Sequence, residues 1–249
     1  MNSKIALTFV CAASCLTTLA SAQTTTFEKT QWAVSAGMNR YTEPGLMQLE
    51  GPEVGMHLRT RWSRLSQYQL EADVLLGSQR YTSESSGTLN HVANIETRWR
   101  AMRKVWLGST PQTGISTGLA VHTLWNDLRG TTSADKYGYQ RIATQLWLPV
   151  RWNSPYNWDI EGGLLIYGRH TSKLSEVSTS YSDITNTQRR GRYMQATYGF
   201  NLRNGDTVKP FMRYTYLGDS NTVTMANQNW IEPNSDRWQM GLIWEFNPR

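Results

Sequence analysis

A histidine and a serine two residues apart, His170 and Ser172, have the types and spacing needed for nucleophilic chemistry. In an extended chain, residues i and i+2 lie on one face, so the imidazole can take a proton from the hydroxyl. A carboxylate that orients the imidazole completes such a set, and Glu176 is the candidate. The competing interpretation is a polar strand end that enters a serine-rich loop. Because this three-residue pattern is common by chance, we expect the protein not to be an enzyme.

Charged side chains recur at alternate positions along most of the chain, and lysine is scarce among them. The arginine guanidinium is a planar fork that binds carboxylates through paired hydrogen bonds, which suits a confined interior. We therefore predict an internal charge network, read either as a packed core or as the selectivity lining of a channel. Its expected members are Arg59, Arg61, Glu71, Asp73, Glu96, Arg98, Arg100, Arg141, Arg151, Asp159, Glu161, Arg169, Arg213 and Glu245.

Residue spacing gives little support to a metal or cofactor site. His91 and His122 lie in different segments, so their spacing indicates no set of metal ligands. The two cysteines, Cys11 and Cys15, fall inside an apolar leader, and no thiolate or disulfide chemistry is expected once the leader is removed. We expect no metal and no cofactor.

The segments that carry these side chains have a period of two. Successive side chains of a strand point to opposite sides of the pleat, so a period of two predicts β-structure. In 237–246, one face is formed by Trp238, Met240, Leu242, Trp244 and Phe246. Comparable segments occur near 31–41, 54–62, 68–77, 93–101, 115–125, 142–152, 158–169, 194–202 and 208–216. Ten strands are predicted, with eight or twelve as the alternatives.

Connections between these strands alternate in length, with long loops after the odd strands and short turns after the even ones. Outer-membrane barrels show this alternation, with the long loops outside the cell and the turns in the periplasm. Aromatic residues gather at the strand ends as two girdles, as expected where rings sit at headgroup level. The girdle beside the short turns is predicted to contain Trp32, Trp62, Tyr68, Trp152, Trp158 and Phe246, and the opposite girdle Trp125, Tyr216 and Trp238.

The fold class is therefore predicted as all-β, an antiparallel transmembrane β-barrel with long extracellular loops and short periplasmic turns. A soluble β-sandwich or lipocalin-like barrel would also alternate, but its charged face would meet water and would favour lysine. The girdles and the arginine–carboxylate faces favour the membrane barrel.

The beginning of the chain has the pattern of a secretory leader. Lys4 precedes an apolar run, and Ala20-Ser21-Ala22 forms a cleavage site, so 1–22 is predicted to be removed. A short polar periplasmic lead, 23–30, and a single barrel domain, 31–249, would follow. Export argues against nucleic acid as the partner of the basic chain, whose formal charge is +6. The expected partners are outer-membrane lipids, lipopolysaccharide, the barrel-assembly machinery and an unidentified extracellular ligand.

Several phrases resemble a widespread, largely uncharacterised family of small outer-membrane β-barrel proteins of Gram-negative bacteria. They are YTEPGLM at 41–47, YGYQR at 137–141, LWLPV at 146–150, KPFMRY at 209–214 and IEPN at 231–234. The resemblance covers most of the mature chain and implies the same fold and an outer-membrane location. It implies no activity and no site residues.

Together these patterns predict a surface or envelope protein with a largely filled lumen that acts through polar extracellular loops. The alternative is a small channel for ions or solutes. A lipid A-modifying enzyme is a third reading, because outer-membrane deacylases use a His-x-Ser pair on a barrel strand, as at His170. An omptin-like protease would need paired aspartates and an Asp–His couple near the rim, and no histidine is suitably close in sequence to Asp127 or Asp183.

Overall fold

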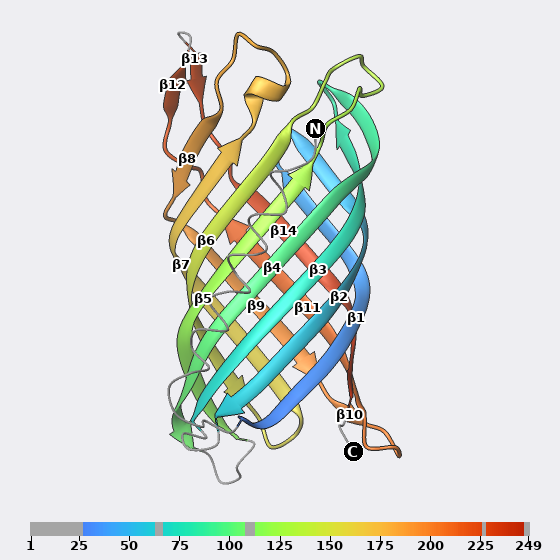
Figure 1. The fold of residues 1–249 in the computed structure, drawn as a ribbon, viewed down its shortest axis with the longest axis vertical. Coiled ribbons are helices and arrows are strands. Elements are labelled where there is room, and N and C mark those ends of the chain that lie inside the picture. Colours follow the sequence, from blue (N-terminus) through green and yellow to red (C-terminus); the bar gives the residue numbers. More distant parts are fainter. Residues whose placement is uncertain (1–26, 63–66, 108–112, 226–227, 247–249) are drawn as a thin grey trace.

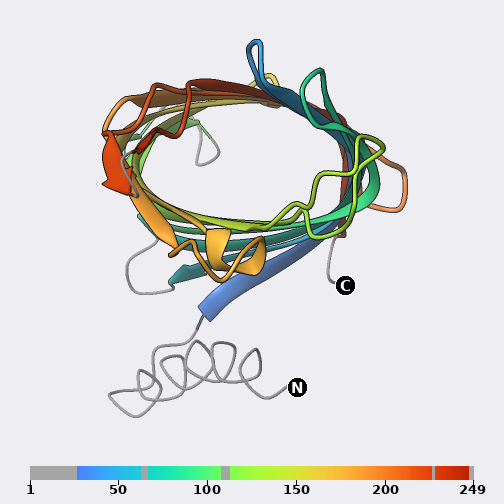
Figure 2. The same ribbon diagram turned by 90° about the horizontal axis from the view of Figure 1, so that it is seen from above.

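The computed structural model describes residues 27–62, 67–107, 113–225 and 228–246, and they form a closed antiparallel β-barrel (Figures 1 and 2). Seven long strands come first, and they pair in chain order. They are β1 (Phe27–Glu43), β2 (Met47–Trp62), β3 (Tyr68–Ser83), β4 (Gly87–Leu107), β5 (Gly114–Asp127), β6 (Gln140–Asn153) and β7 (Trp158–Ser172).

The eighth strand of the ring is broken into three pieces, and two further strands complete the barrel. The pieces are β8 (Ile184–Gln188), β9 (Gly191–Tyr198) and β10 (Phe200–Asn201), followed by β11 (Thr207–Leu217) and β14 (Ser235–Phe246). Pairing of β14 with both β11 and β1 closes the ring, which makes ten strands in the circuit. Figure 2 shows the ring as a flattened oval. The prediction of ten strands is confirmed.

The seam between β1 and β14 depends on two glycines that face each other. Gly37 pairs with Gly241 in the antiparallel register. A Cβ atom built on Gly37 would lie 2.2 Å from the carbonyl oxygen of Met240, which no real side chain tolerates. The two bare backbones can therefore approach closely at the seam, where a larger residue would force the strands apart.

The strands are longer than a bilayer requires. A tilted transmembrane strand needs about 9–11 residues, whereas β4 has 21 and β1 has 17. At the extracellular end, β1 and β2 are joined by a tight turn at 44–46, and β3 and β4 by another at 84–86. Two of the expected long loops are thus strand extensions with short turns. No helix of the described residues is long and apolar enough to cross a membrane.

Three longer connections remain at the extracellular end, at the top of Figure 1. They are 128–139, the segment 173–183 with the short helix η3 (Leu174–Glu176), and 218–234, which carries the hairpin β12 (Val223–Met225) and β13 (Gln228–Trp230). At the other end, the strand β1 begins at Phe27, so part of the predicted lead at 23–30 belongs to the barrel. The predicted leader at 1–22 lies outside the described residues.

Large apolar side chains cover the outside of the barrel. Exposed apolar groups recur at alternate positions of the strands, with Val54 at 55% and Met56 at 56% of full exposure. Five predicted girdle residues are exposed on this outer face, namely Trp32, Trp152, Trp158, Trp238 and Phe246. Tyr68, Trp125 and Tyr216 are half-buried, and the side chain of Trp62 lies outside the described part. A surface of this kind is stable against lipid and unfavourable in water.

The interior holds most of the predicted charge network, with one correction. Arg169, predicted to face the lumen, is exposed on the outside of β7. A register shift between Leu146 and Trp147 leaves Ile166 without a partner on β6, because Leu146 pairs with Tyr167 and Trp147 with Leu165. One extra residue reverses the direction of every later side chain in the strand.

Candidate functional site in the barrel interior

A lower cluster of charges, in the half of the barrel nearer the short turns, is centred on Glu71. Its carboxylate lies 3.3 Å from the Nε of Arg59 and 2.7 Å from the Nε of Arg100. Arg151, from β6, also donates to Glu71, over 2.8 Å from its Nη2. Glu71 is 4% exposed. Three guanidinium groups therefore converge on one buried carboxylate.

Two further carboxylates balance those arginines. Arg100 contacts Asp73 at 2.5 Å and Glu161 at 3.5 Å. Arg151 donates to Glu161 from its Nε over 2.8 Å, and Tyr193 donates its hydroxyl to the same carboxylate over 2.8 Å. The lower cluster is close to neutral, as a buried set of charges must be to avoid a large desolvation cost.

A middle cluster joins β4 to β14 across the ring. Arg98 contacts Glu96 at 2.7 Å and donates to the side-chain oxygen of Gln239 over 2.5 Å. Arg237 reaches Glu96 at 2.8 Å and Glu53 at 3.2 Å. Two arginines and two glutamates again balance.

An upper cluster ties an extracellular loop to the wall. Arg141 contacts Glu43 at 2.5 Å and also Glu232, and His170 Nδ1 lies 2.6 Å from the Glu232 carboxylate. Glu232 belongs to the connection 218–234, so this contact anchors the loop inside the mouth. Burial alone would raise the pKa of Glu232, but the charges of Arg141 and His170 outweigh burial and lower it below its ordinary range.

Arg213 stands apart from these clusters. It is 2% exposed; its guanidinium lies 3.9 Å from the centre of the Tyr193 ring, and its Nη1 donates to Gln195 over 3.2 Å. In the part of the chain that the structure describes, it has no carboxylate within ion-pair distance. Cation–π contact and an amide oxygen hold this arginine in place.

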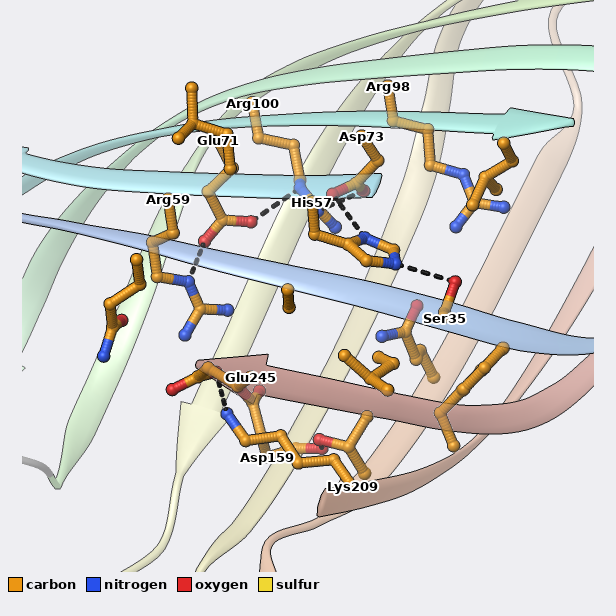
Figure 3. Close-up of a pocket in the computed structure, with 18 of the residues that line it drawn as sticks. Ser35, His57, Arg59, Glu71, Asp73, Arg98, Arg100, Asp159, Lys209 and Glu245 are labelled. Carbon is orange, nitrogen blue, oxygen red and sulfur yellow. Dashed lines mark hydrogen bonds and ion pairs between the residues drawn. The ribbon is translucent and has the colours of Figure 1, made fainter. Parts of the chain in front are cut away.

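Ser35, His57 and Asp73 form a chain of hydrogen bonds on the inner wall of the barrel, as Figure 3 shows. Ser35 Oγ lies 2.9 Å from His57 Nε2, and His57 Nδ1 lies 3.0 Å from Asp73 Oδ1. Asp73 is also held by Arg100, which keeps its carboxylate an acceptor. His57 then donates from Nδ1, and in the neutral imidazole its Nε2 accepts the hydroxyl proton of Ser35.

This chain borders a cavity in the lower half of the lumen. It has a volume of about 80 Å³ and is lined in part by Ser35, His57 and Asp73. A second cavity, of about 30 Å³, lies between the middle and upper clusters beside His122 and Arg213. Both can hold only small groups or a few waters.

The predicted nucleophilic set at the end of β7 does not assemble. His170 and Ser172 are both buried in the lumen, and the acid beside His170 is Glu232. Glu176, the predicted acid, accepts a hydrogen bond from the backbone N–H of Gln140 over 2.8 Å instead. Because the pair faces inward, lipid outside the barrel cannot reach it, which argues against the reading as a lipid A deacylase.

The remaining predicted network residues lie at the periplasmic mouth. Asp159 is 3.6 Å from Arg151, and Glu245 is 2.5 Å from Lys209. Arg61 is exposed there, with its Nε 3.4 Å from Gln69. Among the described residues, no group of three His, Cys, Asp or Glu side chains could hold a metal ion.

Sequence reasoning missed Ser35, His57, Glu53 and Glu232. The inward direction of Ser35 and His57 could have been predicted, because both occupy the inward face of strands that were correctly assigned. What was absent was the register that sets Ser35 opposite Gly55 and His57 opposite Asp73. Glu232 lies in a loop, where alternation says nothing.

No protein family model matches the chain, and no curated protein matches it. Among solved structures, the beta domain of the Bordetella autotransporter BrkA gives a TM-score of 0.46 at 10% identity, over 89% of this chain and 100% of that one. The outer membrane protease OmpT from Escherichia coli gives 0.42 at 10% identity, over 91% and 99%. The translocator domain of the autotransporter NalP from Neisseria meningitidis gives 0.42 at 11% identity, over 97% and 96%.

The chain's own geometry meets the requirements of a sheet in lipid. Apart from β8, which pairs only with β7, and the two-residue β10, which pairs only with β11, each strand of the ring has a neighbour on both sides, so its backbone groups in the hydrocarbon are paired. The outside is apolar and the inside is charged, which is the reverse of a soluble barrel. The protein is a ten-stranded β-barrel of the bacterial outer membrane.

Proposed function

We propose that this barrel is a closed envelope protein, whose lumen passes no ions and whose extracellular loops carry its role at the cell surface. The observation that carries the proposal is the ion pair between Arg141 on β6 and Glu43 on β1. These strands are five apart in either direction around the ring of ten. The pair therefore spans the barrel along a full diameter near its mouth.

The middle and lower clusters also support a closed lumen. Arg98 and Arg237 link β4 to β14, four strands apart, and Arg151 links β6 to Glu71 on β3. Between these bridges, Trp147 is wholly buried and packs against Tyr193 with ring centres 5.2 Å apart. A channel needs a continuous aqueous path, whereas the two cavities described above, lined by described residues, are small, at about 80 and about 30 Å³.

Planar-bilayer recording of the refolded mature chain tests the closed lumen. We expect no discrete conductance steps from inserted protein. A matched variant, Arg141→Ala, removes only the diametric bridge, and it should also show no discrete steps, because the middle and lower clusters still fill the lumen. Stable, ion-selective steps from the wild-type protein would overturn the proposal in favour of a small channel.

Side-chain contacts hold the loops at the extracellular end together. Asn221 accepts from both the backbone N–H and the hydroxyl of Thr187, over 2.6 and 3.1 Å. Tyr181 packs edge-on against Trp230, with ring centres 6.2 Å apart. The connection 218–234 is thus attached to β8 through Asn221 and to the connection 173–183 through the contact of Trp230 with Tyr181. The resulting polar platform supports an extracellular ligand as partner.

Outward-facing arginines on the same side of the barrel support lipopolysaccharide as a second partner. Arg169, Arg189, Arg190 and Arg192 are all exposed, and Arg192 lies over the ring of Tyr216 at 5.7 Å. Guanidinium groups at this level of the membrane suit lipid phosphates, which they bind bidentately.

Native mass spectrometry of the purified barrel tests this partner. Replacing Arg169 and Arg192 together by glutamine should reduce bound lipopolysaccharide several-fold. Arg103→Gln is the matched control, because Arg103 is also exposed and lies over an aromatic ring, that of Tyr68 at 5.5 Å, but at the periplasmic end. Equal loss in both variants would show that charge alone, and not this site, retains the lipid.

A further inference from the structure

We propose that Ser35, His57 and Asp73 form a nucleophilic site inside the barrel that transfers small acyl groups from esters to water. The arrangement has the three parts that such chemistry requires: a hydroxyl, an imidazole within hydrogen-bond reach, and a carboxylate that orients the imidazole. The two links measure 2.9 and 3.0 Å. The three residues come from adjacent strands, β1, β2 and β3, so the rigid sheet fixes their spacing.

The direction of the hydrogen bonds matches that of an activated serine. Asp73 accepts from Arg100 through one oxygen and from His57 through the other. Its proximity to Arg100 keeps it ionised, and an ionised carboxylate accepts only. In the neutral imidazole, His57 therefore presents an unprotonated Nε2 to the hydroxyl of Ser35, which is the state in which it can act as a general base.

Gly55, which has no side chain, lies beside Ser35 and His57 and leaves room for their contact. A Cβ atom built on Gly55 would lie 2.5 Å from Ser35 Oγ and 3.2 Å from His57 Nε2. Any larger residue there would push the serine and the histidine apart. The absence of a side chain at this position thus permits the contact between them.

Access to the site is from the periplasmic mouth. The cavity of about 80 Å³ is bounded above by Glu53, Arg98 and Gln239 of the middle cluster, and its lower lining includes Arg59 and Lys209. The His57 side chain keeps 20% of its exposure. Ser35 is three residues from Trp32 along β1, which is about 10 Å. The site is the blind end of a shallow pocket, and this is compatible with a lumen closed to ions.

Size and charge define the substrate class. A cavity of about 80 Å³ is about half the volume of an engineered cavity of roughly 150 Å³ that binds benzene, so it suits an acyl group of acetyl size. The lining of the same cavity includes carboxylates, such as Glu71, as well as the guanidinium groups of Arg59 and Arg98. The two guanidinium groups favour the negative charge that develops on the carbonyl oxygen. We therefore infer a short-chain acyl ester presented from the periplasm.

The reaction balances with water as the only co-reactant. Ser35 Oγ attacks the ester carbonyl carbon as its proton passes to His57 Nε2. The bond to the alkoxy group breaks, and His57 returns the proton to the departing alcohol. Water then attacks the acyl-Ser35 ester and gives its proton to His57, and the carboxylic acid leaves as the proton returns to Ser35. Asp73 acts as a positioning residue, because it touches only the imidazole.

The test uses the refolded mature chain in detergent with p-nitrophenyl acetate as the probe. We expect a burst of p-nitrophenolate followed by slow turnover, and tandem mass spectrometry should find acetate on the peptide that contains Ser35. Ser35→Ala should reduce the rate to that of protein-free micelles, and His57→Gln should reduce it by at least about 100-fold. Ser172→Ala is the matched control, since Ser172 is also a buried serine beside a histidine in the lumen, and it should leave the rate unchanged.

Two further variants separate catalysis from structure. Gly55→Ala keeps all three groups and should abolish acetylation of Ser35 by separating them. Asp73→Asn should lower kcat with KM unchanged, whereas a purely structural role would change the folded fraction, read as the shift of unboiled protein in gel electrophoresis. Absence of acetyl-Ser35 in folded wild-type protein, or an equal rate in folded Ser35→Ala, would overturn the proposal.

Discussion

Glu71→Gln tests whether the lower charge cluster stabilises the barrel as a core. The substitution keeps the shape of the side chain and removes its charge. In the wild-type protein, Glu71 neutralises Arg59 at 3.3 Å and Arg100 at 2.7 Å, and it also binds Arg151. After the change, three guanidinium groups would face one neutral amide.

The expected loss of unfolding free energy depends on the carboxylate partners that each arginine keeps. Removing one partner of a buried ion pair costs about 3–5 kcal/mol, because the other charge is left without compensation. Arg100 would still contact Asp73 and Glu161, and Arg151 would still contact Glu161. The loss should therefore fall at the lower end of that range, at about 3 kcal/mol.

Urea unfolding of the refolded chain in lipid vesicles, followed by tryptophan fluorescence, measures this free energy. With a urea dependence of about 1–3 kcal/mol per molar, the midpoint should fall by about 1–3 M. The matched control is Glu50→Gln. Glu50 lies 4.0 Å from Arg40 on the outside, where both side chains are about half exposed, so its loss should cost less than about 1 kcal/mol.

A double-mutant cycle identifies the cause. The double variant Arg151→Met with Glu71→Gln should lose less unfolding free energy than the sum of the losses in the two single variants. The reason is that Arg151→Met removes a charge that Glu71→Gln leaves unpaired. An effect of Glu71→Gln no larger than that of Glu50→Gln would refute the reasoning. The lower cluster would then be hydrated enough to tolerate a free charge.

Other regions of the molecule give independent predictions. The pKa of Glu232 is lowered below its ordinary value of 4.5, so the stabilisation it provides should be complete at pH 7 and lost as the pH falls below that value. The difference in unfolding free energy between wild type and Glu232→Gln should accordingly vanish at acid pH. Gly37→Ala should prevent closure of β1 on β14, because its Cβ would collide with the backbone of Met240; folded protein in unboiled gel samples should be scarce, and abundant folded protein would contradict it. Trp147 is 0% exposed, so Trp147→Ala should cost about 3–5 kcal/mol in the urea assay, and a smaller cost would mean that water fills the space.

The aromatic and charged faces of the strands could be read directly from the chain. A period of two is a local property, and it holds whatever the strand pairs with. For this reason the inward positions of Glu96, Arg98 and Arg100 in β4, and the outward positions of Trp238 and Met240 in β14, agree with their placement in the structure. The number of strands followed from the same pattern and from the turns between them.

Arg169 shows where a local pattern fails. One unpaired residue, Ile166, shifts the register of β7 against β6 and turns Arg169 outward and His170 inward. Nothing in the alternation of β7 alone marks that residue as extra, because the shift exists only relative to a neighbouring strand. The predicted acid Glu176 failed for a related reason, since the carboxylate that reaches His170 comes from Glu232, 62 residues further along the chain.

The sequence by itself thus determined that this chain is a membrane barrel, which face of each regular strand is apolar, and that arginines and carboxylates share its interior. Only the tertiary structure decided which of them meet. Ser35, His57 and Asp73 are brought together by the registers of β1 with β2 and of β2 with β3. Register depends on pairing energies summed along whole strands, and no short stretch of residues encodes it.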